Sequence, residues 1–255
     1  MSDNRKSQEA AILTREGGAA IAYRRTAGAA PGVMFLGGFR SDMTGAKALA
    51  LEGFCRARKQ GFLRFDYSGH GATGGEFTRC TISTWLGDSL DALDRLTQGP
   101  QILVGSSMGG WIMLLVALAR PERVHALIGV APAPDFTEDL LYTVFDAGQR
   151  MALERDGAID LPSDYGDRPY PIARTLIVEA RRHLLLGAPI PLACPVRLLQ
   201  GMADADVPRR HALRLVERIE GGDVQLTLIK DGDHRLSRPQ DLARLCAVID
   251  GLAAA

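Results

Sequence analysis

The sequence predicts an α/β protein in which a mostly parallel central sheet is flanked by helices. Short apolar runs typical of strands alternate with longer helical patterns along most of the 255 residues. The alternation stops over residues 133–192, a proline-containing stretch of mostly helical pattern that is too long for an ordinary crossover. We therefore expect one domain over residues 1–255, with its core at about 10–132 and 193–255 and a helical lid inserted at about 133–192.

Strands are predicted where an apolar run ends at turn residues. Residues 12–14 and 20–23 flank Gly17 and Gly18, which predicts an opening hairpin. The run at 33–36 ends at Gly37 and Gly38, and the run at 62–65 leads into a glycine-rich polar loop. The later strands are expected at 102–104, 124–130, 196–199 and 224–229.

Helices are predicted where apolar residues recur at helical spacing or where an apolar run is too long for a strand. One stretch carries a core-facing stripe made of Trp85, Leu86, Leu90, Leu93 and Leu96. The helices of the core are expected at 46–59, 82–96, 111–119, 208–220 and 239–252.

Composition excludes several classes of function. The 30 basic and 30 acidic residues give a formal net charge of zero, which argues against nucleic-acid partners and electrostatic membrane attachment. The four cysteines lie far apart and no histidines cluster, so no metal site, disulfide framework or cofactor is expected. Residues 1–9 have neither the apolar core of a signal peptide nor an arginine-rich, acid-poor transit pattern, so we expect a cytoplasmic protein without a membrane span.

The most informative motif is Gly105-Ser106-Ser107-Met108-Gly109, which lies between an apolar strand and an apolar helix. This strand–turn–helix context is the one that a nucleophile elbow requires. The middle serine projects above the sheet in a strained conformation, so Ser107 is the candidate nucleophile, and we interpret Ser106 as structural. The alternative is that the glycines only allow a tight turn and close packing of the helix.

A serine nucleophile needs a base, and the base needs an orienting carboxylate. In this kind of fold they follow the serine in the order acid, then base, each after a late strand. Asp204 follows the strand at 196–199, and His234 follows the strand at 224–229. Asp206 is the alternative acid, although it also suits the N-cap of the next helix. His70 is the least implausible substitute for the base.

Two backbone N–H groups are expected to stabilise the oxyanion. One belongs to Met108, next to the nucleophile, and the other to Phe39, in the glycine-rich loop after the strand at 33–36. Within the expected lid, a stripe of apolar residues either lines an acyl pocket or packs the lid against its body. Its members are Phe136, Leu140, Val144 and Phe145.

In their order along the chain, these motifs resemble the landmarks of the α/β-hydrolase superfamily over nearly the whole length. A narrower resemblance is to the branch of the mitochondrial palmitoyl-protein thioesterase that also hydrolyses acyl glucuronides. Gly37 departs from the pattern, because relatives often have His or Pro there. The motifs that carry the narrower resemblance are Gly38-Phe39-Arg40-Ser41-Asp42-Met43, Lys47-Ala48-Leu49-Ala50, Arg64-Phe65-Asp66-Tyr67-Ser68-Gly69 and Asp233-His234-Arg235.

The resemblance implies an α/β-hydrolase fold and assigns nucleophile, acid and base to Ser107, Asp204 and His234. The predicted function is hydrolysis of carboxylic ester or thioester bonds in small-molecule or acyl substrates, through an acyl-enzyme. Two alternatives stay open at this point. The same three residues suit an acyltransferase that uses an alcohol as acceptor, and triad residues also occur in hydrolase-fold receptors with little turnover.

Overall fold

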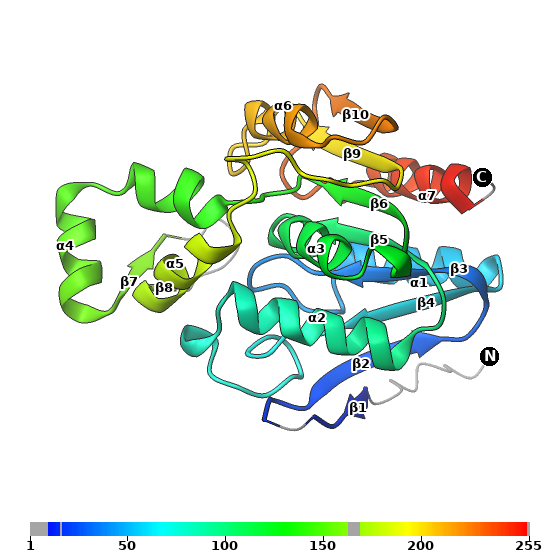
Figure 1. Ribbon diagram of the computed structural model, residues 1–255, viewed down its shortest axis with the longest axis horizontal. Coiled ribbons are helices and arrows are strands. Elements are labelled where there is room, and N and C mark those ends of the chain that lie inside the picture. Colours follow the sequence, from blue (N-terminus) through cyan, green and yellow to red (C-terminus); the bar gives the residue numbers. More distant parts are fainter. Residues whose placement is uncertain (1–9, 16, 163–168, 254–255) are drawn as a thin grey trace.

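The computed structural model describes residues 10–15, 17–162 and 169–253 (Figure 1). Within this part of the chain, eight strands form a central sheet in the order β1-β2-β4-β3-β5-β6-β9-β10. Each pair of neighbouring strands from β4 to β10 is parallel, whereas the β1–β2 and β2–β4 pairs are antiparallel. This arrangement confirms the predicted mostly parallel sheet. The strands are β1 (Ala11–Leu13), β2 (Ile21–Thr26), β3 (Ala29–Leu36), β4 (Gln60–Phe65), β5 (Gln101–Ser106), β6 (Val124–Val130), β9 (Val196–Gly201) and β10 (Val224–Ile229).

Helices cover both faces of the sheet, as predicted (Figure 1). On one face, Leu51 and Ile249 belong to a common apolar cluster, and on the other face Trp85, Ile112 and Leu215 do. No helix in the described residues is both long and apolar enough to cross a bilayer. The helices around the sheet are α1 (Ala46–Ala57) and α7 (Pro239–Ala253) on the first face, and α2 (Ile82–Leu96), α3 (Met108–Ala119) and α6 (Arg209–Arg218) on the second.

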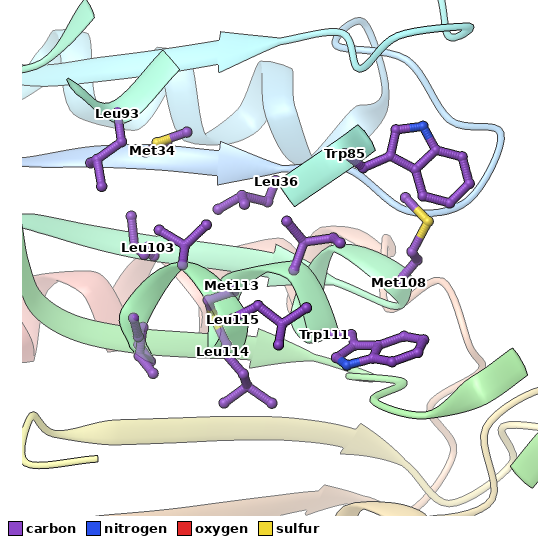
Figure 2. Packing of buried hydrophobic residues seen from close by; sticks show 14 of the residues in the cluster. Met34, Leu36, Trp85, Leu93, Leu103, Met108, Trp111, Met113, Leu114 and Leu115 are labelled. Carbon is purple, nitrogen blue, oxygen red and sulfur yellow. The ribbon is translucent and has the colours of Figure 1, made fainter. Parts of the chain in front are cut away.

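Helix α3 lies at the centre of the second face, and its side chains are buried almost all round. It packs against β5, β6 and β3 and lies beside α2, so it needs no polar face. Figure 2 shows Met108 and Trp111 at one end of this cluster, on the same side as Trp85. The helix that follows the candidate nucleophile is therefore held on all sides by core packing.

The junction between β5 and α3 depends on two glycines. A β-carbon at Gly105 would overlap the backbone of Gly109, and one at Gly109 would overlap the carbonyl groups of Leu36 and Gly37. Strand β3, strand β5 and helix α3 thus approach one another backbone to backbone. Only residues without a side chain permit this approach.

Helix α2 carries one buried residue that the predicted apolar stripe does not contain. Trp85, Leu93 and Leu96 are buried as expected, but Asp88 is fully buried on the same face. Its carboxylate accepts the Ser68 N–H at 2.6 Å and pairs with Arg15 at 2.7 Å. A buried charge requires such partners. Asp88 therefore holds the loop after β4 and the opening hairpin against α2.

The segment between β6 and β9 is less helical than predicted. It contains a π-helical turn (Thr137–Leu141), α4 (Ala147–Asp156) and α5 (Arg174–Ala180), but also the antiparallel strands β7 (Ala158–Leu161) and β8 (Tyr170–Ala173). Strands of four residues are too short to show a two-residue period, which explains the error. The residues between them, 163–168, lie outside the described part.

This segment extends to one side of the sheet (Figure 1) and has a small apolar cluster of its own. Phe145, Leu153, Ile172 and Ile177 form that cluster. At the base of the segment, the buried carboxylate of Asp135 accepts the N–H groups of Leu185 and Leu186 at 2.8 and 2.7 Å. The start and the end of the segment are thereby joined across 50 residues.

We expect Gly109→Ala to lower the free energy of unfolding by about 3 kcal/mol, because the new methyl group overlaps backbone atoms that cannot move aside. Gly53→Ala is the matched control. Gly53 lies within α1 with open space around its α-carbon, so the substitution should stabilise the protein by about 0.5–1 kcal/mol. Urea unfolding followed by circular dichroism measures both. Equal stability of the Gly109→Ala variant and the original protein would contradict the close approach of Gly109 to the backbone of Leu36 and Gly37.

Candidate active site

Ser107 lies at the turn between β5 and α3 with a left-handed backbone, at φ 55° and ψ −121°. Its N–H donates to Val130 O at 3.0 Å, and its carbonyl oxygen accepts the N–H groups of Gly110 and Ala133 at 2.8 and 3.0 Å. These bonds hold a conformation that a residue with a side chain rarely adopts. Ser106, in contrast, is the last residue of β5 and is buried. The two serines are therefore in different positions, and Ser107 occupies the elbow.

His234 brings the candidate residues together. Its Nε2 lies 3.0 Å from Ser107 Oγ, and its Nδ1 lies 2.9 Å from Asp204 Oδ2. Because an ionised carboxylate only accepts, Nδ1 carries the proton, and Nε2 is left to accept from the serine hydroxyl. The structure thus places in one chain of hydrogen bonds three side chains that follow β5, β9 and β10.

Asp204 is oriented by four hydrogen bonds. Its Oδ1 accepts the N–H groups of Asp206 and Val207 at 3.0 and 2.8 Å, and its Oδ2 accepts from Gln200 Nε2 at 3.0 Å as well as from His234. The Asp204 side chain is completely buried. A carboxylate held in this way has one orientation, and that orientation faces the imidazole.

The N-cap role predicted for Asp206 is wrong. Helix α6 begins at Arg209, its N-cap is Pro208, and no side chain caps it. Proline at the N-cap forces the chain to enter the helix from an extended conformation, which leaves Asp206 in the preceding turn. The Asp206 side chain is exposed, and one of its carboxylate oxygens lies within 4.8 Å of ring or carboxylate atoms of Asp204 and His234.

Both predicted oxyanion donors belong to backbone that adjoins Ser107. Met108 is the first residue of α3, and the N–H groups of a helix's first turn have no acceptor within the helix. Phe39 lies in the turn Gly38-Phe39-Arg40-Ser41, which is closed by a hydrogen bond from Ser41 N–H to Gly38 O at 3.1 Å. A β-carbon placed on Gly38 would lie 3.4 Å from the β-carbon of Ser107, so this turn backs directly onto the serine.

The Phe39 ring joins the core to the segment between β6 and β9. Its centroid lies 5.0 Å from that of Phe77 and 5.9 Å from that of Trp85, both in the core. It also lies 5.7 Å from Phe136 and 6.1 Å from Tyr170, both in the inserted segment. An aromatic cluster therefore borders the candidate site.

The apolar stripe predicted in the inserted segment is divided. Phe136 contacts the aromatic cluster beside the site, whereas Phe145 is buried in the segment's own core. Val144 is 69% exposed and Leu140 is half-buried. The π-helical and 3-10 turns between 137 and 144 break the regular helical spacing on which the stripe was based.

The remaining histidines are hydrogen-bonded elsewhere. His125 lies 2.9 Å from Leu252 O, His211 lies 2.6 Å from Pro134 O, and His183 contacts Ser83 and Glu179. His70, the substitute base, is buried beside the Phe39 turn instead of the serine hydroxyl. Burial lowers the pKa of His70 to about 4, so its imidazole is neutral at physiological pH.

Lys47 was not among the predicted site residues. Its Nζ donates to Arg235 O at 2.5 Å and lies 3.3 Å from Ser237 Oγ, so it supports the loop that carries His234. Burial lowers the pKa of Lys47 to about 8. The sequence does contain a sign of this position. Lys47, Leu51 and Cys55 follow one another at four-residue spacing, which places Lys47 on the core-facing side of α1.

Comparisons with known proteins agree with this architecture. Residues 45–154 match the family described as serine aminopeptidase, S33. A mouse protein named mitochondrial palmitoyl-protein thioesterase ABHD10 is 45% identical over 233 residues, covering 91% of this chain and 78% of that protein. The human protein of the same name is 42% identical over 233 residues, covering 91% of this chain and 76% of that protein.

Solved structures give the same result. A putative hydrolase from Agrobacterium vitis matches with a TM-score of 0.91 at 42% identity, covering 96% of this chain and 97% of that one. Mouse alpha/beta hydrolase domain-containing protein 10 matches with a TM-score of 0.89 at 43% identity, covering 96% and 98%. Together these findings confirm the predicted α/β-hydrolase fold and the resemblance to the thioesterase branch.

The predicted cytoplasmic location is contradicted by the same comparison. Relatives at 42–45% identity are named as mitochondrial, which points to mitochondria rather than the cytoplasm. The prediction depended on a missing targeting pattern in residues 1–9, which lie outside the described part of the chain. Receptors read targeting segments separately from the folded domain, so the domain's own composition does not report the compartment.

We expect the stability advantage of the original protein over a His70→Gln variant to fall by about 2 kcal/mol between pH 7.5 and pH 5. An unfolded histidine takes up a proton near pH 6.5, whereas folded His70 stays neutral until about pH 4. The contribution of neutral His70 is therefore complete above pH 6.5 and is lost as the pH falls toward 4. Urea unfolding of both proteins at each pH measures the difference. If the difference in free energy of unfolding between the two proteins does not change with pH, His70 is not held in its neutral form.

Proposed function

The chain belongs to the family of the mitochondrial palmitoyl-protein thioesterase ABHD10, and we propose that it is a serine hydrolase that cleaves carboxylic ester or thioester bonds through an acyl-enzyme. The observation that carries the proposal is the hydrogen-bonded series from Ser107 Oγ through His234 to Asp204. This series can remove the serine proton and stabilise the imidazolium that results.

In the first step, His234 Nε2 takes the proton of Ser107 as the serine oxygen attacks the substrate carbonyl carbon. The tetrahedral intermediate collapses, His234 gives that proton to the leaving alcohol or thiol, and the acyl group stays on Ser107. In the second step, His234 removes a proton from water, and the hydroxide attacks the acyl-enzyme. Return of the proton to Ser107 releases the carboxylic acid. The steps need no cofactor.

The N–H groups of Phe39 and Met108 would hold the negative charge on the carbonyl oxygen in both intermediates. Such donors are effective because they are already oriented before charge develops. The turn at Gly38 backs onto Ser107, and α3 begins at Met108, which supports this assignment.

We infer that the chain forms one domain with a core at about 10–132 and 193–255, and that residues 133–192 act as a lid. Phe136 and Tyr170 of the inserted segment contact Phe39 beside the candidate nucleophile, so the segment borders the path to the serine. The aromatic surroundings favour an apolar acyl group. The names of the relatives support a long-chain acyl thioester as substrate.

We expect Ser107→Ala to lower turnover of a palmitoyl thioester on the order of a million-fold, because the nucleophile is lost. The matched control is Ser106→Ala, which removes the neighbouring hydroxyl and should keep turnover within about three-fold, since Ser106 has no part in the mechanism. Release of free thiol measures both, with acetyl and palmitoyl thioesters compared in parallel. Full activity of Ser107→Ala would refute the proposal, and a preference confined to acetyl would argue against a long acyl pocket.

We expect Asp204→Asn to lower turnover about 10⁴-fold, because the amide no longer holds His234 in the required tautomer. Asp206→Asn makes the same chemical change two residues away and should alter turnover by less than about ten-fold. Labelling with a fluorophosphonate probe, which requires an activated serine, should slow in Asp204→Asn and persist in Asp206→Asn. If Asp206→Asn causes the larger loss, the acid has been assigned to the wrong residue. Labelling of the original protein without any turnover would indicate a binding protein instead of an enzyme.

A further inference from the structure

The carboxylate of Asp204 is held differently at its two oxygens. Oδ1 accepts the N–H groups of Asp206 and Val207 at 3.0 and 2.8 Å, so the backbone of its own turn fixes this oxygen. Oδ2 lies 2.9 Å from His234 Nδ1 and accepts from Gln200 Nε2 at 3.0 Å. The oxygen that faces the imidazole is therefore also bound by the side-chain amide of Gln200.

The surroundings of Gln200 determine which way its amide points. Besides binding Asp204 Oδ2, its Nε2 donates to Val207 O at 2.9 Å and lies 3.2 Å from Gly201 O. Carbonyl oxygens and an ionised carboxylate only accept, so turning the amide over would place Oε1 against three acceptors. The NH2 group of the amide must therefore face Asp204.

The other end of the same amide has no partner. Gln200 is completely buried, and no donor within the described residues binds its Oε1. A buried acceptor without a donor is destabilising, and native proteins contain few of them. A methionine of similar length would fill the same space without an unpaired oxygen. The presence of an amide here thus points to a use for its NH2 group.

Gln200 belongs to the part of the sheet on which both the acid and the base are built. It lies near the end of β9, which pairs with β6 on one side and β10 on the other (Figure 1). The next residue, Gly201, lets the loop of His234 approach, because a β-carbon there would overlap Gly232 O. Ala203 N–H also donates to Gly232 O at 2.9 Å. The amide therefore holds the carboxylate from a rigid strand that also supports the base.

We infer that Gln200 is a positioning residue for hydrolysis: by donating to Asp204 Oδ2, it keeps that oxygen against His234 Nδ1 while the imidazole takes up and returns the serine proton. This inference rests on the proposed function, because Asp204 is the acid of that mechanism. The same NH2 group binds Val207 O, and Val207 N–H binds Asp204 Oδ1, so rotation of the carboxylate breaks bonds at both oxygens. Gln200 touches neither substrate nor Ser107 in this role and acts through Asp204.

Two substitutions of similar volume separate the donor from the packing. Gln200→Met removes the NH2 group and keeps an unbranched side chain of similar length. Gln200→His supplies a ring N–H that reaches about as far as the amide nitrogen, so it can donate to Asp204 Oδ2. Both variants disturb the same completely buried position. A difference in turnover between them therefore reports the donor.

Gln60→Met is the matched control. Gln60 is also buried, its Nε2 donates to Pro31 O at 2.6 Å, and its Oε1 likewise has no donor within the part of the chain that the structure describes. It begins β4, at the amino edge of the parallel strands, whereas Ser107 follows the carboxyl end of β5. The same chemical change is thereby made away from the candidate site.

We expect Gln200→Met to lower kcat for a palmitoyl thioester about 20-fold with little change in KM, because losing a hydrogen bond that orients a functional group typically lowers activity about 10–100-fold. Gln200→His and Gln60→Met should keep kcat within about three-fold. In an Asp204→Ala background, Gln200→Met should change kcat by less than about two-fold, since the carboxylate that Gln200 holds is absent. A packing defect would instead lower kcat by the same factor in both backgrounds.

The controls distinguish the possible failures. Circular dichroism and thermal transitions first establish a temperature at which every variant is folded, and all assays are run there. Equal kcat for Gln200→Met and Gln200→His, or an equal loss with and without Asp204, would overturn the role of Gln200 while the proposed hydrolase activity stands. An original protein that hydrolyses no ester or thioester, or a Ser107→Ala variant with full activity, would instead refute the proposed function.

Discussion

The backbone of Ser107 is the constraint on which the rest of the site depends. A non-glycine residue at φ 55° is held there by hydrogen bonds to Val130, Gly110 and Ala133, so the end of β6 and the first turn of α3 both contribute. The close packing of Gly105 against Gly109 removes the space into which the turn could relax. Strain at a site persists only when its surroundings over-determine it. Here the surroundings are the central strands of the sheet, which are also the most buried part of the molecule.

Buried aspartates organise the loops around this centre. Asp66 accepts backbone N–H groups from Met43 and Ala72, Asp135 from Leu185 and Leu186, and Asp204 from Asp206 and Val207. Asp66 and Asp135 thus bind backbone far from them in the sequence, whereas Asp204 closes the turn in which it lies. Burial raises the pKa of Asp66 and Asp135, and the backbone donors partly oppose that change. The loops at the carboxyl edge of the sheet consequently behave as parts of the core.

The features that the sequence predicted well have local signatures. Strand ends, the elbow at Ser107 and the order of Asp204 and His234 follow from short patterns and from the parallel sheet, and the structure brings these three side chains together. Their catalytic roles stay predictions. The features that were missed depend on contacts between distant residues. No local pattern could show that Arg15 pairs with Asp88, that Lys47 reaches Arg235, or that His70 accepts from Arg40. The hairpin of β7 and β8 was missed because its strands are too short to show a period.

The hydrogen bonds of Asp135 have a consequence for how such proteins diversify. They join the two ends of the inserted segment at its base, so the chain leaves and re-enters the core at neighbouring points. The entropy of closing a loop grows only with the logarithm of its length, about 0.6 kcal/mol for each doubling. The segment can therefore lengthen, shorten or be exchanged between relatives while the sheet and its elbow stay unchanged. The joined ends make this part of the chain a segment that can change in length without refolding the sheet.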